Sequence, residues 1–543
     1  MITMKRYQAI IPLILALLVS ACKESRFLEF PYYDGPVTED QFWNLNASAR
    51  GQLNRGYNFL QEGYNRYSGA MLAAGSDEAV NSNLNSDINI FNNGTWSSLR
   101  TLDDSYATNY NGLRQVNLFL ENAHRANIIP LTDIPRLRAE AFFLRAFFHF
   151  ELWKRYGGII IADHVFNQND NLDLPRNTPE ETLAQILKDC DSAAVKLPLS
   201  PAQYGAGDKG RATKAAALAL KSRALLYAAS PLSNASGDIA LWQKAAAASK
   251  ELIDTKAHSL LPKYTDIFNF STAAYNAEVI FATAANLRND IETNNAPISY
   301  NGALGLTNPT QELVDAYEMK NGLPVTDPQS GYNAADPYKD RDPRLGWSVI
   351  YNGSTFKGTQ VNTMAGGKDG LGVSVNATKT GYYMRKFLSE AASWNQTTNA
   401  TVRRPWVIFR YAEILLNYAE AQNEAAGPDA TVYDAVNQIR QRAGMPVLPQ
   451  GLSKDQMRSR IRNERRVELA FEEHRFFDVR RWKTGEKDFA APVSGMRIST
   501  SGTGAVYERF IVAQRVFSDR MYRYPIPQGE INNTTKLVQN PGY

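Results

Sequence analysis

The chain has 543 residues, of which 44% are hydrophobic and 21% are charged, and its formal net charge is +4 at pH 7. The length allows about two to four domain-sized units, and the apolar content is that of a globular protein with a sizeable core. Because the charge is nearly balanced and no basic run occurs, the composition gives no support to nucleic-acid binding.

The first 21 residues are predicted to be a signal peptide. Lys5 and Arg6 supply a positive start, and residues 10–19 form a short apolar run that a proline interrupts. Such a run is too short to span a membrane comfortably, and it has the order of charge and hydrophobicity that export signals show.

A lipid anchor is predicted at Cys22. The small residues Ser20 and Ala21 stand directly before this cysteine, as at a bacterial lipoprotein processing site. Acylation of Cys22 would make the protein membrane-anchored, because acyl chains bury many methylene groups. The alternative is a plain secreted protein, since Val19 stands where such sites prefer leucine. Residues 22–36 are the expected linker.

The only other cysteine is Cys190. If Cys22 is acylated, Cys190 has no partner, so no disulfide framework is expected. It falls in a helical pattern of apolar residues and is predicted to be a small core residue. No later apolar run is long enough for a transmembrane helix.

Helical patterns dominate residues 37–275, the expected amino-terminal part. One helix is predicted to begin at Pro135, a favoured first residue, and to continue through a phenylalanine-rich stretch to Tyr156. Gly157 should end it, because glycine tolerates the left-handed conformation found at helix ends.

Two further helices are expected at residues 215–229 and 242–253. Both are rich in alanine, and small residues let helices approach closely, so we expect them to pair as a hairpin. A tetratricopeptide array is the natural comparison, but no clean repeat of about 34 residues is present, so any repeats are degenerate.

Residues 205–210, Gly-Ala-Gly-Asp-Lys-Gly, fit the glycine pattern of dinucleotide-binding proteins. That pattern requires a hydrophobic strand before it, and here prolines and a tyrosine precede it instead. We therefore expect a loop at this place, and no cofactor.

Residues 276–543 are the expected carboxyl-terminal part, interleaved with the first in one globule. Within it, residues 286–400 are rich in Gly, Asn, Thr and Pro, and helical periodicity is lost except at residues 311–319. Long loop with short strands is predicted. Loops of such length in a compact protein are often functional.

Helices are predicted again at residues 405–427 and 432–443, and from Ser453 onward. Gln456 stands three residues after Ser453, which is the pattern of a capping box. Residues 524–528 hold two prolines and should be extended, because proline does not fit a helix interior.

Residues 461–482 combine acids, arginines and aromatic residues at helical spacing. Glu464 and Glu468 lie four residues apart with two arginines beside them, and a structural ion-pair network is the expected role. The alternative is a metal or acid–base site formed by Glu464, Glu468 and His474. Metal sites usually contain more histidine, and the chain has only five.

Several stretches, in this order, resemble the SusD/RagB family of surface nutrient-capture lipoproteins, and the resemblance covers nearly the whole mature chain. Each stretch alone would be a weak signal, but together they are specific. They are residues 143–146 with 156–158, 210–223, 410–421, 439–444, 461–482, 524–527 and 539–543.

The resemblance implies a mainly α fold of tetratricopeptide-like helical hairpins in a right-handed superhelix, with few short strands and a loop-rich, irregular ligand-binding face. It implies a lipoprotein on the outer surface of a Gram-negative cell, where it captures oligosaccharides for a SusC-like TonB-dependent transporter and acts as its lid. In the RagB branch the cargo is peptide. No catalysis, cofactor or metal belongs to that scheme.

Ligand contacts are predicted first in the amino-terminal part. A sugar stacks its C–H face on an aromatic ring and needs amide or carboxylate partners for its hydroxyls, and residues 64–96 supply all of these groups. The alternative is a tryptophan packed in the core with asparagines in turns. The candidates are Tyr64, Tyr67, Asp77, Glu78 and Trp96.

Further candidates lie in the loop-rich segment, because aromatic residues in loops are often functional. They are Tyr300, Asn301, Trp347 and Trp394. Tryptophans within helical patterns are instead predicted to be core residues, and these are Trp153, Trp242, Trp406 and Trp482. The cluster of Tyr382, Arg385 and Lys386 is expected to support the loops.

A surface glycoside hydrolase is the competing class. Glu472 and Glu473 are adjacent and would point in different directions on a helix, so they could not flank one glycosidic bond as a hydrolase requires. Between saccharide and peptide capture, rings with amides favour sugar. Neither the glycan nor its linkage is specified by the sequence.

Overall fold

The computed structural model describes residues 37–205, 208–270, 275–394, 398–502 and 504–543. The expected signal peptide, the linker and Cys22 lie outside these residues, as do Ala206 and Gly207 of the glycine pattern.

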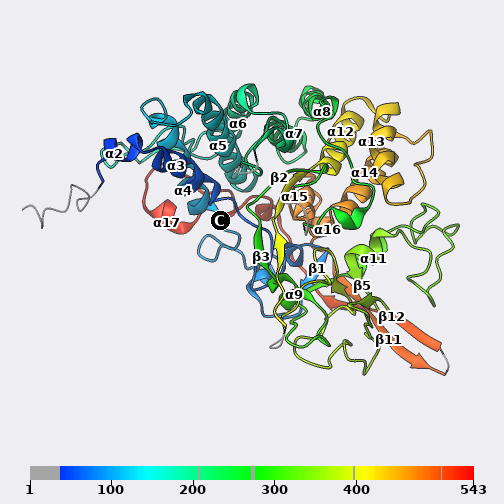
Figure 1. Cartoon of the computed structure of the whole chain (residues 1–543). Helices are drawn as coiled ribbons and strands as arrows, with labels where there is room; N and C mark the ends of the chain where they lie inside the picture. Colours follow the sequence, from blue (N-terminus) through cyan, green and yellow to red (C-terminus); the bar gives the residue numbers. More distant parts are fainter. Residues whose placement is uncertain (1–36, 206–207, 271–274, 395–397, 503) are drawn as a thin grey trace, which may run out of the picture.

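The amino-terminal part consists of helices, and sequence neighbours pack on each other from α3 to α8. Figure 1 shows them side by side in an arc along one side of the molecule, as tetratricopeptide-like stacking requires. The predicted hairpin of α7 and α8 is confirmed. The helices are α2 (Glu39–Asn44), α3 (Asn46–Tyr57), α4 (Tyr106–Asn122), α5 (Ile134–Tyr156), α6 (Pro179–Lys196), α7 (Lys214–Ala229) and α8 (Ile239–Asp254).

Helix α5 forms where the sequence predicts it. Pro135 occupies the first turn, and Gly157 ends the helix at φ 78°, a left-handed conformation that glycine adopts without steric cost. Phe143, Phe148 and Phe150 are completely buried, because α4, α6 and α7 all pack around this helix.

The arc continues with α12, which packs against α8, and with α13 and α14, which pack against α12. The capping box of Ser453 and Gln456 begins α14 as predicted. These carboxyl-terminal helices are α12 (Tyr411–Ala426), α13 (Ala430–Arg442), α14 (Lys454–Glu468), α15 (His474–Arg481), α16 (Gly485–Asp488) and α17 (Gln528–Asn532).

The helix predicted at residues 405–427 is wrong over its first residues. Val407–Arg410 form strand β10, which pairs antiparallel with β2 (Val279–Ala282). All four residues of β10 are buried, and β-branched and aromatic side chains fit a buried strand well.

Residues 461–482 form two helices instead of one continuous helix. Helix α14 ends at Glu468 and α15 begins at His474. Phe471 and Glu473 adopt positive φ values of 64° and 67° in the turn between them. Such backbone is costly for residues with side chains, and the ion pair of Glu473 with Arg66 helps to hold it.

The loop-rich segment is confirmed, and some of its short strands pair with distant parts of the chain. For example, β3 pairs with β9 and β1 with β4, both antiparallel. The strands are β1 (Ala79–Asn81), β3 (Asn286–Arg288), β4 (Thr307–Pro309), β5 (Val349–Ile350), β6 (Thr355–Phe356), β7 (Thr359–Gln360), β8 (Tyr383–Met384) and β9 (Val402–Arg404). The short helices are α9 (Asp290–Asn295), α10 (Gln311–Ala316) and α11 (Arg344–Ser348).

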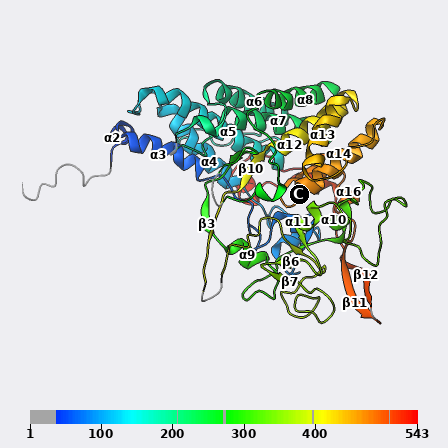
Figure 2. The ribbon, with the colours of Figure 1, turned by 45° about the vertical axis from the view of Figure 1, so that its right-hand side comes forward.

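The irregular side lies opposite the arc of long helices in both views (Figures 1 and 2). Single turns of 3-10 helix occur on this side and also in the arc, where η4 precedes α5 and η5 lies between α6 and α7. They are η2 (Leu72–Gly75), η3 (Asp87–Ile90), η4 (Leu131–Asp133), η5 (Pro201–Gln203), η6 (Tyr264–Asp266) and η7 (Asp519–Tyr522). The molecule is therefore mainly helical with one irregular face, as predicted.

A long hairpin, β11 (Val493–Ser501) and β12 (Gly504–Ala513), projects from the irregular side (Figure 2). No strand was predicted at these residues. Apart from the buried Ile498, the residues of its outer half are exposed or only partly buried, so the contrast between buried and exposed residues that identifies strands is weak there.

Glu468 stands at the centre of a buried network that joins α14 to three other parts of the chain. Its carboxylate accepts hydrogen bonds from Arg344 at 3.1 Å, from Arg410 at 2.7 Å and from Arg442. Burial acts to raise the pKa of Glu468, but the arginine charges outweigh it and hold the pKa below its ordinary value.

Glu464 accepts in the same way from Arg344 and Arg440. The predicted structural ion-pair network is therefore confirmed, and the alternative metal site is not. Among the described residues, no group of His, Cys, Asp and Glu side chains is placed to hold a metal ion.

Cys190 is buried in α6 without a disulfide, in agreement with its predicted core role. The tryptophans of the helical patterns are likewise buried, as predicted: Trp153, Trp242, Trp406 and Trp482. In the described part of the chain, none of the helices is both long and apolar enough to cross a membrane.

Candidate ligand cleft

The irregular face contains an open cleft of about 700 Å³. Four pieces of chain enclose it, namely η6 with the residues after it, α11, residues 385–391, and the strand pair β3–β9. Ligand pockets usually have volumes of about 300–1,000 Å³, so the cleft is large enough for a small oligosaccharide or a short peptide.

Aromatic rings form one wall of the cleft. Trp347 is half-buried on α11 and stacks on Tyr264, with ring centroids 5.5 Å apart and planes at 20°. Beside them Phe268 meets Phe387 edge to face, with centroids 4.8 Å apart. Tyr264 donates a hydrogen bond to the Glu468 carbonyl at 3.1 Å, so the ion network at the protein's centre fixes the ring on which Trp347 rests.

The floor of the cleft is charged but internally neutralised. Lys386 is buried and donates to Glu472 at 2.6 Å and to the Glu468 carbonyl at 3.1 Å. Burial lowers the pKa of the Lys386 ammonium, and the nearby Glu472 carboxylate opposes that shift. Arg404 pairs in turn with Glu292. These charges hold the floor in place and are already partnered within the protein.

The rim supplies polar groups that can meet ligand hydroxyls or amides. Arg385 is half-buried, donates to the Thr355 carbonyl at 2.7 Å and pairs with the exposed Glu390 at 3.2 Å. Hydroxyl and guanidinium groups of Thr265, Ser389, Thr401 and Arg403 line the rest. A cleft with a ring on one side and polar groups around it suits a saccharide, which is apolar on its faces and polar at its edges.

Of the predicted ligand residues, Trp347 lies in this cleft. The residues Phe268, Arg403 and Glu390 were missed, and Arg385 was expected only to support the loops. Their sequence carries no local signal, because they come from separate segments, one of them strand β9, that meet only in the folded chain.

Tyr300, Asn301 and Trp394 come together as a second surface beside the cleft. Tyr300 meets Phe356 edge to face at 5.2 Å and donates to its carbonyl, while Asn301 is exposed. A side-chain carbon added at Gly302 would lie 3.5 Å from the Trp394 ring. Leu388 packs against this cluster and also lines the cleft, so the two surfaces are neighbours.

The prediction of Trp96 as a ligand contact is wrong in this structure. Its side chain is 0% exposed and packs edge to face on Phe91 and Tyr524, with centroids 4.8 Å and 4.5 Å away. Tyr64 and Tyr67 are each only 4% exposed. A ligand at the surface cannot reach these rings, which belong to the core.

Asp77 and Glu78 are also buried, so the predicted ligand role is corrected for both. Asp77 accepts hydrogen bonds from Arg475 and Arg466, each at 2.8 Å. Burial raises the pKa of Glu78 to about 8, and the neighbouring Asp77 carboxylate adds to the shift. The aromatic, acidic and amide side chains of residues 64–96 indicated a sugar site. A buried region that contains polar side chains can have the same composition.

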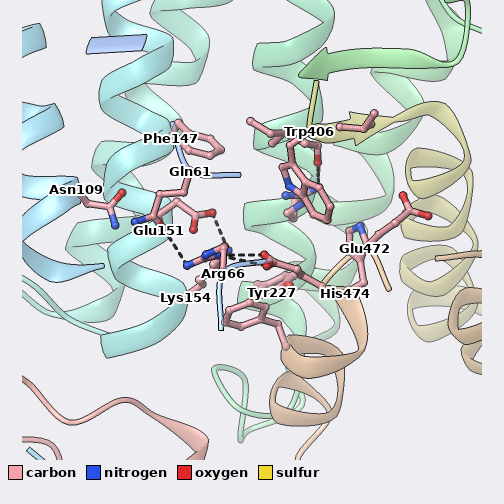
Figure 3. Close-up of a pocket in the computed structure, with 15 residues that line it drawn as sticks. Gln61, Arg66, Asn109, Phe147, Glu151, Lys154, Tyr227, Trp406, Glu472 and His474 are labelled. Carbon is pink, nitrogen blue, oxygen red and sulfur yellow. Dashed lines mark hydrogen bonds and ion pairs between the residues drawn. The ribbon is translucent and has the colours of Figure 1, made fainter. Parts of the chain in front are cut away.

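A small cavity lies among α5, α7, β10 and α15 (Figure 3). Its volume is about 50 Å³, which accommodates only a few water molecules. Charged side chains surround it in pairs, including Lys154 with Glu151 at 2.7 Å and Arg66 with Glu473 at 3.2 Å. It is too small for a sugar ring.

His474 borders this cavity and was part of the alternative metal site. Its Nδ1 faces Arg465 at 3.3 Å. Burial first, and then the positive charge of Arg465, keep the pKa of His474 well below its ordinary value. The neutral imidazole therefore sits among cations, which repel a metal ion.

Two family models match the chain. One is described as the SusD family and matches residues 267–543, and one described as starch-binding associating with outer membrane matches residues 40–226. Among curated proteins, SusD-like protein P2 of Formosa agariphila is 26% identical over 425 residues, which are 75% of this chain and 74% of that protein.

Solved structures are similar over nearly the full length. A SusD-like protein from Bacteroides fragilis NCTC 9343 is 30% identical with a TM-score of 0.80, covering 94% of this chain and 100% of that one. A SusD-like carbohydrate binding protein from the same organism is 26% identical with a TM-score of 0.77, covering 92% of this chain and 100% of that one.

Proposed function

Because the chain belongs to the SusD family, we propose that it is a cell-surface lipoprotein that captures oligosaccharides in the cleft beside Trp347. In this proposal Cys22 carries the lipid anchor in the outer membrane. A SusC-like TonB-dependent transporter receives the cargo, and the protein acts as its lid. One solved relative is a carbohydrate binding protein, which supports the choice of ligand class.

The observation that carries the proposal is the half-buried Trp347 ring at the edge of a polar-rimmed cleft. Its lower face is covered by Tyr264, so the opposite face is the one that a ligand can use. Stacking of a sugar face on this ring would combine with hydrogen bonds to the rim. Peptide capture by the same cleft is the alternative.

Capture without chemistry fits the cleft better than hydrolysis does. A glycoside hydrolase places two carboxyl groups about 5–9.5 Å apart across the scissile bond. Among the described residues that line the cleft, Glu390 is the only carboxylate, and it pairs with Arg385.

The first experiment is calorimetric titration of the protein lacking residues 1–22 with a panel of oligosaccharides and peptides, followed by product analysis of each mixture. We expect saturable binding of an intact oligosaccharide. Binding of peptides alone would move the protein to the peptide-capturing branch, and released sugar products would contradict the proposal that no catalysis occurs.

Replacing Trp347 with alanine should weaken oligosaccharide binding at least tenfold, which corresponds to about 1.4 kcal/mol, because the stacking surface is lost. Trp347→Phe keeps a ring and should retain most of the affinity. Tyr507→Ala is the matched control, since Tyr507 is a half-buried ring on β12, outside the cleft. Titration calorimetry measures all three, and unchanged affinity in Trp347→Ala would rule out this cleft.

Replacing Cys22 with alanine should release the protein from the membrane, because the acyl chains could no longer be attached. Cys190→Ala is the control, since Cys190 is buried in α6 and offers no site for a lipid. Immunoblots of membrane and soluble fractions report the result. Retention of Cys22→Ala in the membrane fraction would show that the anchor lies elsewhere.

A further inference from the structure

A second open cleft, of about 400 Å³, lies at the carboxyl-terminal end of α5. It shares no described lining residue with the cleft beside Trp347. Three of the sequence stretches that resemble the family meet here. The proposed capture of oligosaccharides beside Trp347 does not use these stretches. They contribute Tyr156, Gly157 and Gly158, then Arg523 just before Tyr524, and finally Asn540.

Hydrogen bonds hold the three stretches together. The Asn540 side-chain amide donates to the Tyr156 carbonyl at 3.0 Å and to the Tyr524 carbonyl at 2.7 Å. The Tyr524 amide donates to the Arg155 carbonyl at 2.8 Å. These bonds fix the backbone around the cleft and bring the side chains of Arg176 and Arg523 to its wall.

The hydrogen bonds of Arg176 and Arg523 go only to uncharged acceptors. Arg176 donates to the Tyr156 and Gly158 carbonyls, each at 2.6 Å, and to the Asn540 side chain at 2.9 Å. Arg523 donates to the Trp153 carbonyl at 3.3 Å and to the Ser233 hydroxyl at 3.1 Å. In the part of the chain that the structure describes, neither guanidinium forms an ion pair, whereas Arg344 and Arg410 each meet several carboxylates.

The two guanidinium groups flank one open place. A side-chain carbon added to Gly157 would lie 3.6 Å from Nε of Arg523 and 3.8 Å from Nη2 of Arg176. Both guanidinium groups therefore lie close to the same stretch of the cleft wall, beside Gly157. Lys536 is exposed on the same cleft and adds a third positive charge.

The surroundings of Arg176 and Arg523 disfavour their positive charges. Burial lowers the pKa of Arg523 to about 10, and the positive charge of Arg176 contributes to the shift. Burial also lowers the pKa of Arg176. Both side chains remain cationic at pH 7, so an anion between them would relieve their repulsion and replace lost hydration.

We propose that this cleft binds one oxyanion group, a carboxylate or a sulfate, between Arg176, Arg523 and Lys536. Guanidinium groups match such anions in geometry as well as in charge, and the volume suits a group the size of one sugar ring. The oxyanion comes from an acidic saccharide or is a free inorganic anion. The site does not depend on the proposed capture of oligosaccharides beside Trp347.

Sodium sulfate is the first probe, titrated by calorimetry into the protein lacking residues 1–22 at pH 7 and constant ionic strength. We expect saturable binding to one site. Arg523→Gln should weaken it at least tenfold, and Lys536→Gln about threefold, since an exposed charge interacts less strongly than a half-buried one. Lys536 is exposed, so this variant tests the site even if Arg523→Gln fails to fold.

Arg138→Gln is the matched control, because Arg138 is a half-buried arginine whose hydrogen bond goes to the Leu120 carbonyl, away from this cleft. Its sulfate affinity should equal that of the unchanged protein. Absence of saturable sulfate binding would overturn the proposal, and so would unchanged affinity in both Arg523→Gln and Lys536→Gln.

Glucuronate and glucose identify the source of the oxyanion. Glucuronate that competes with sulfate, while glucose does not, assigns the cleft to an acidic sugar, and sulfate binding without glucuronate binding assigns it to a free inorganic anion. Trp347→Ala should leave sulfate affinity unchanged, and Arg523→Gln should leave binding of neutral oligosaccharides unchanged. Loss of sulfate binding in Trp347→Ala would place the anion in the other cleft and overturn the proposal.

Discussion

Replacement of Glu468 by glutamine should lower the free energy of unfolding by about 3–5 kcal/mol, the usual result of removing one member of a buried ion pair. The Glu468 carboxylate accepts from Arg344, Arg410 and Arg442 and is 0% exposed. The neutral amide would leave these three arginines without the negative charge that balances them. Because the site is buried, water cannot solvate the arginines in its place. Chemical denaturation followed by circular dichroism measures the change.

The control for Glu468 is Glu508→Gln, which removes a carboxylate from the surface pair of Glu508 with Arg497 on the projecting hairpin. Exposed pairs contribute about 0–1 kcal/mol, so this variant should unfold almost as the unchanged protein does. An equally small change in Glu468→Gln would show that the network does not stabilise the fold.

The same change should alter the dependence of stability on pH. The pKa of Glu468 is lowered in the folded protein, whereas in the unfolded chain it is about 4.3. Its contribution is therefore complete well above that value and is lost as the pH falls below it. Between about pH 5 and pH 3, Glu468→Gln should lose less stability on acidification than the unchanged protein.

Replacement of Trp96 by alanine should also destabilise the fold by about 3–5 kcal/mol, the range for removing a large aromatic side chain from a core. The Trp96 ring is 0% exposed and touches Phe91 and Tyr524 edge to face. Its loss would leave a cavity between two parts of the chain that are far apart in sequence. Thermal and denaturant unfolding measure the effect.

Trp347→Ala is the natural comparison for Trp96, because it removes the same side chain from a half-buried position. Trp347→Ala should lower the free energy of unfolding much less than Trp96→Ala does, and it should weaken ligand binding much more. If Trp96→Ala kept the stability of the unchanged protein and lost oligosaccharide binding, the assignment of Trp96 to the core would be wrong.

Helix ends that depend on neighbouring residues were predicted well from the sequence. Proline in the first turn of α5 and the glycine after it located that helix almost to the residue, and Ser453 located the start of α14. Strand β10 was missed because a short apolar run fits a buried strand and a buried helix equally well. Its pairing with β2, more than a hundred residues earlier, decides between them.

The ligand residues were harder to predict because the sequence does not show which side chains are buried in the folded protein. Trp96 and Trp347 stand in similar loop-like sequence, yet one is buried and the other borders a cleft. The difference depends on which distant segments cover each ring, namely Tyr524 over Trp96 and Tyr264 under Trp347. Composition indicated the kinds of group that bind sugar, but tertiary contacts decide which of them face solvent.

Hydrogen bonds that join the carboxyl-terminal segment to the amino-terminal part have a consequence for the order of folding. Tyr524 donates to the buried Asp103, 421 residues earlier in the chain, and Arg515 donates to the Ala79 carbonyl. A chain synthesised amino end first cannot make these contacts until residues 515–540 have emerged. Contacts between such distant residues close slowly, so the core around Asp103 and Ala79 should be completed late, when the last stretch docks.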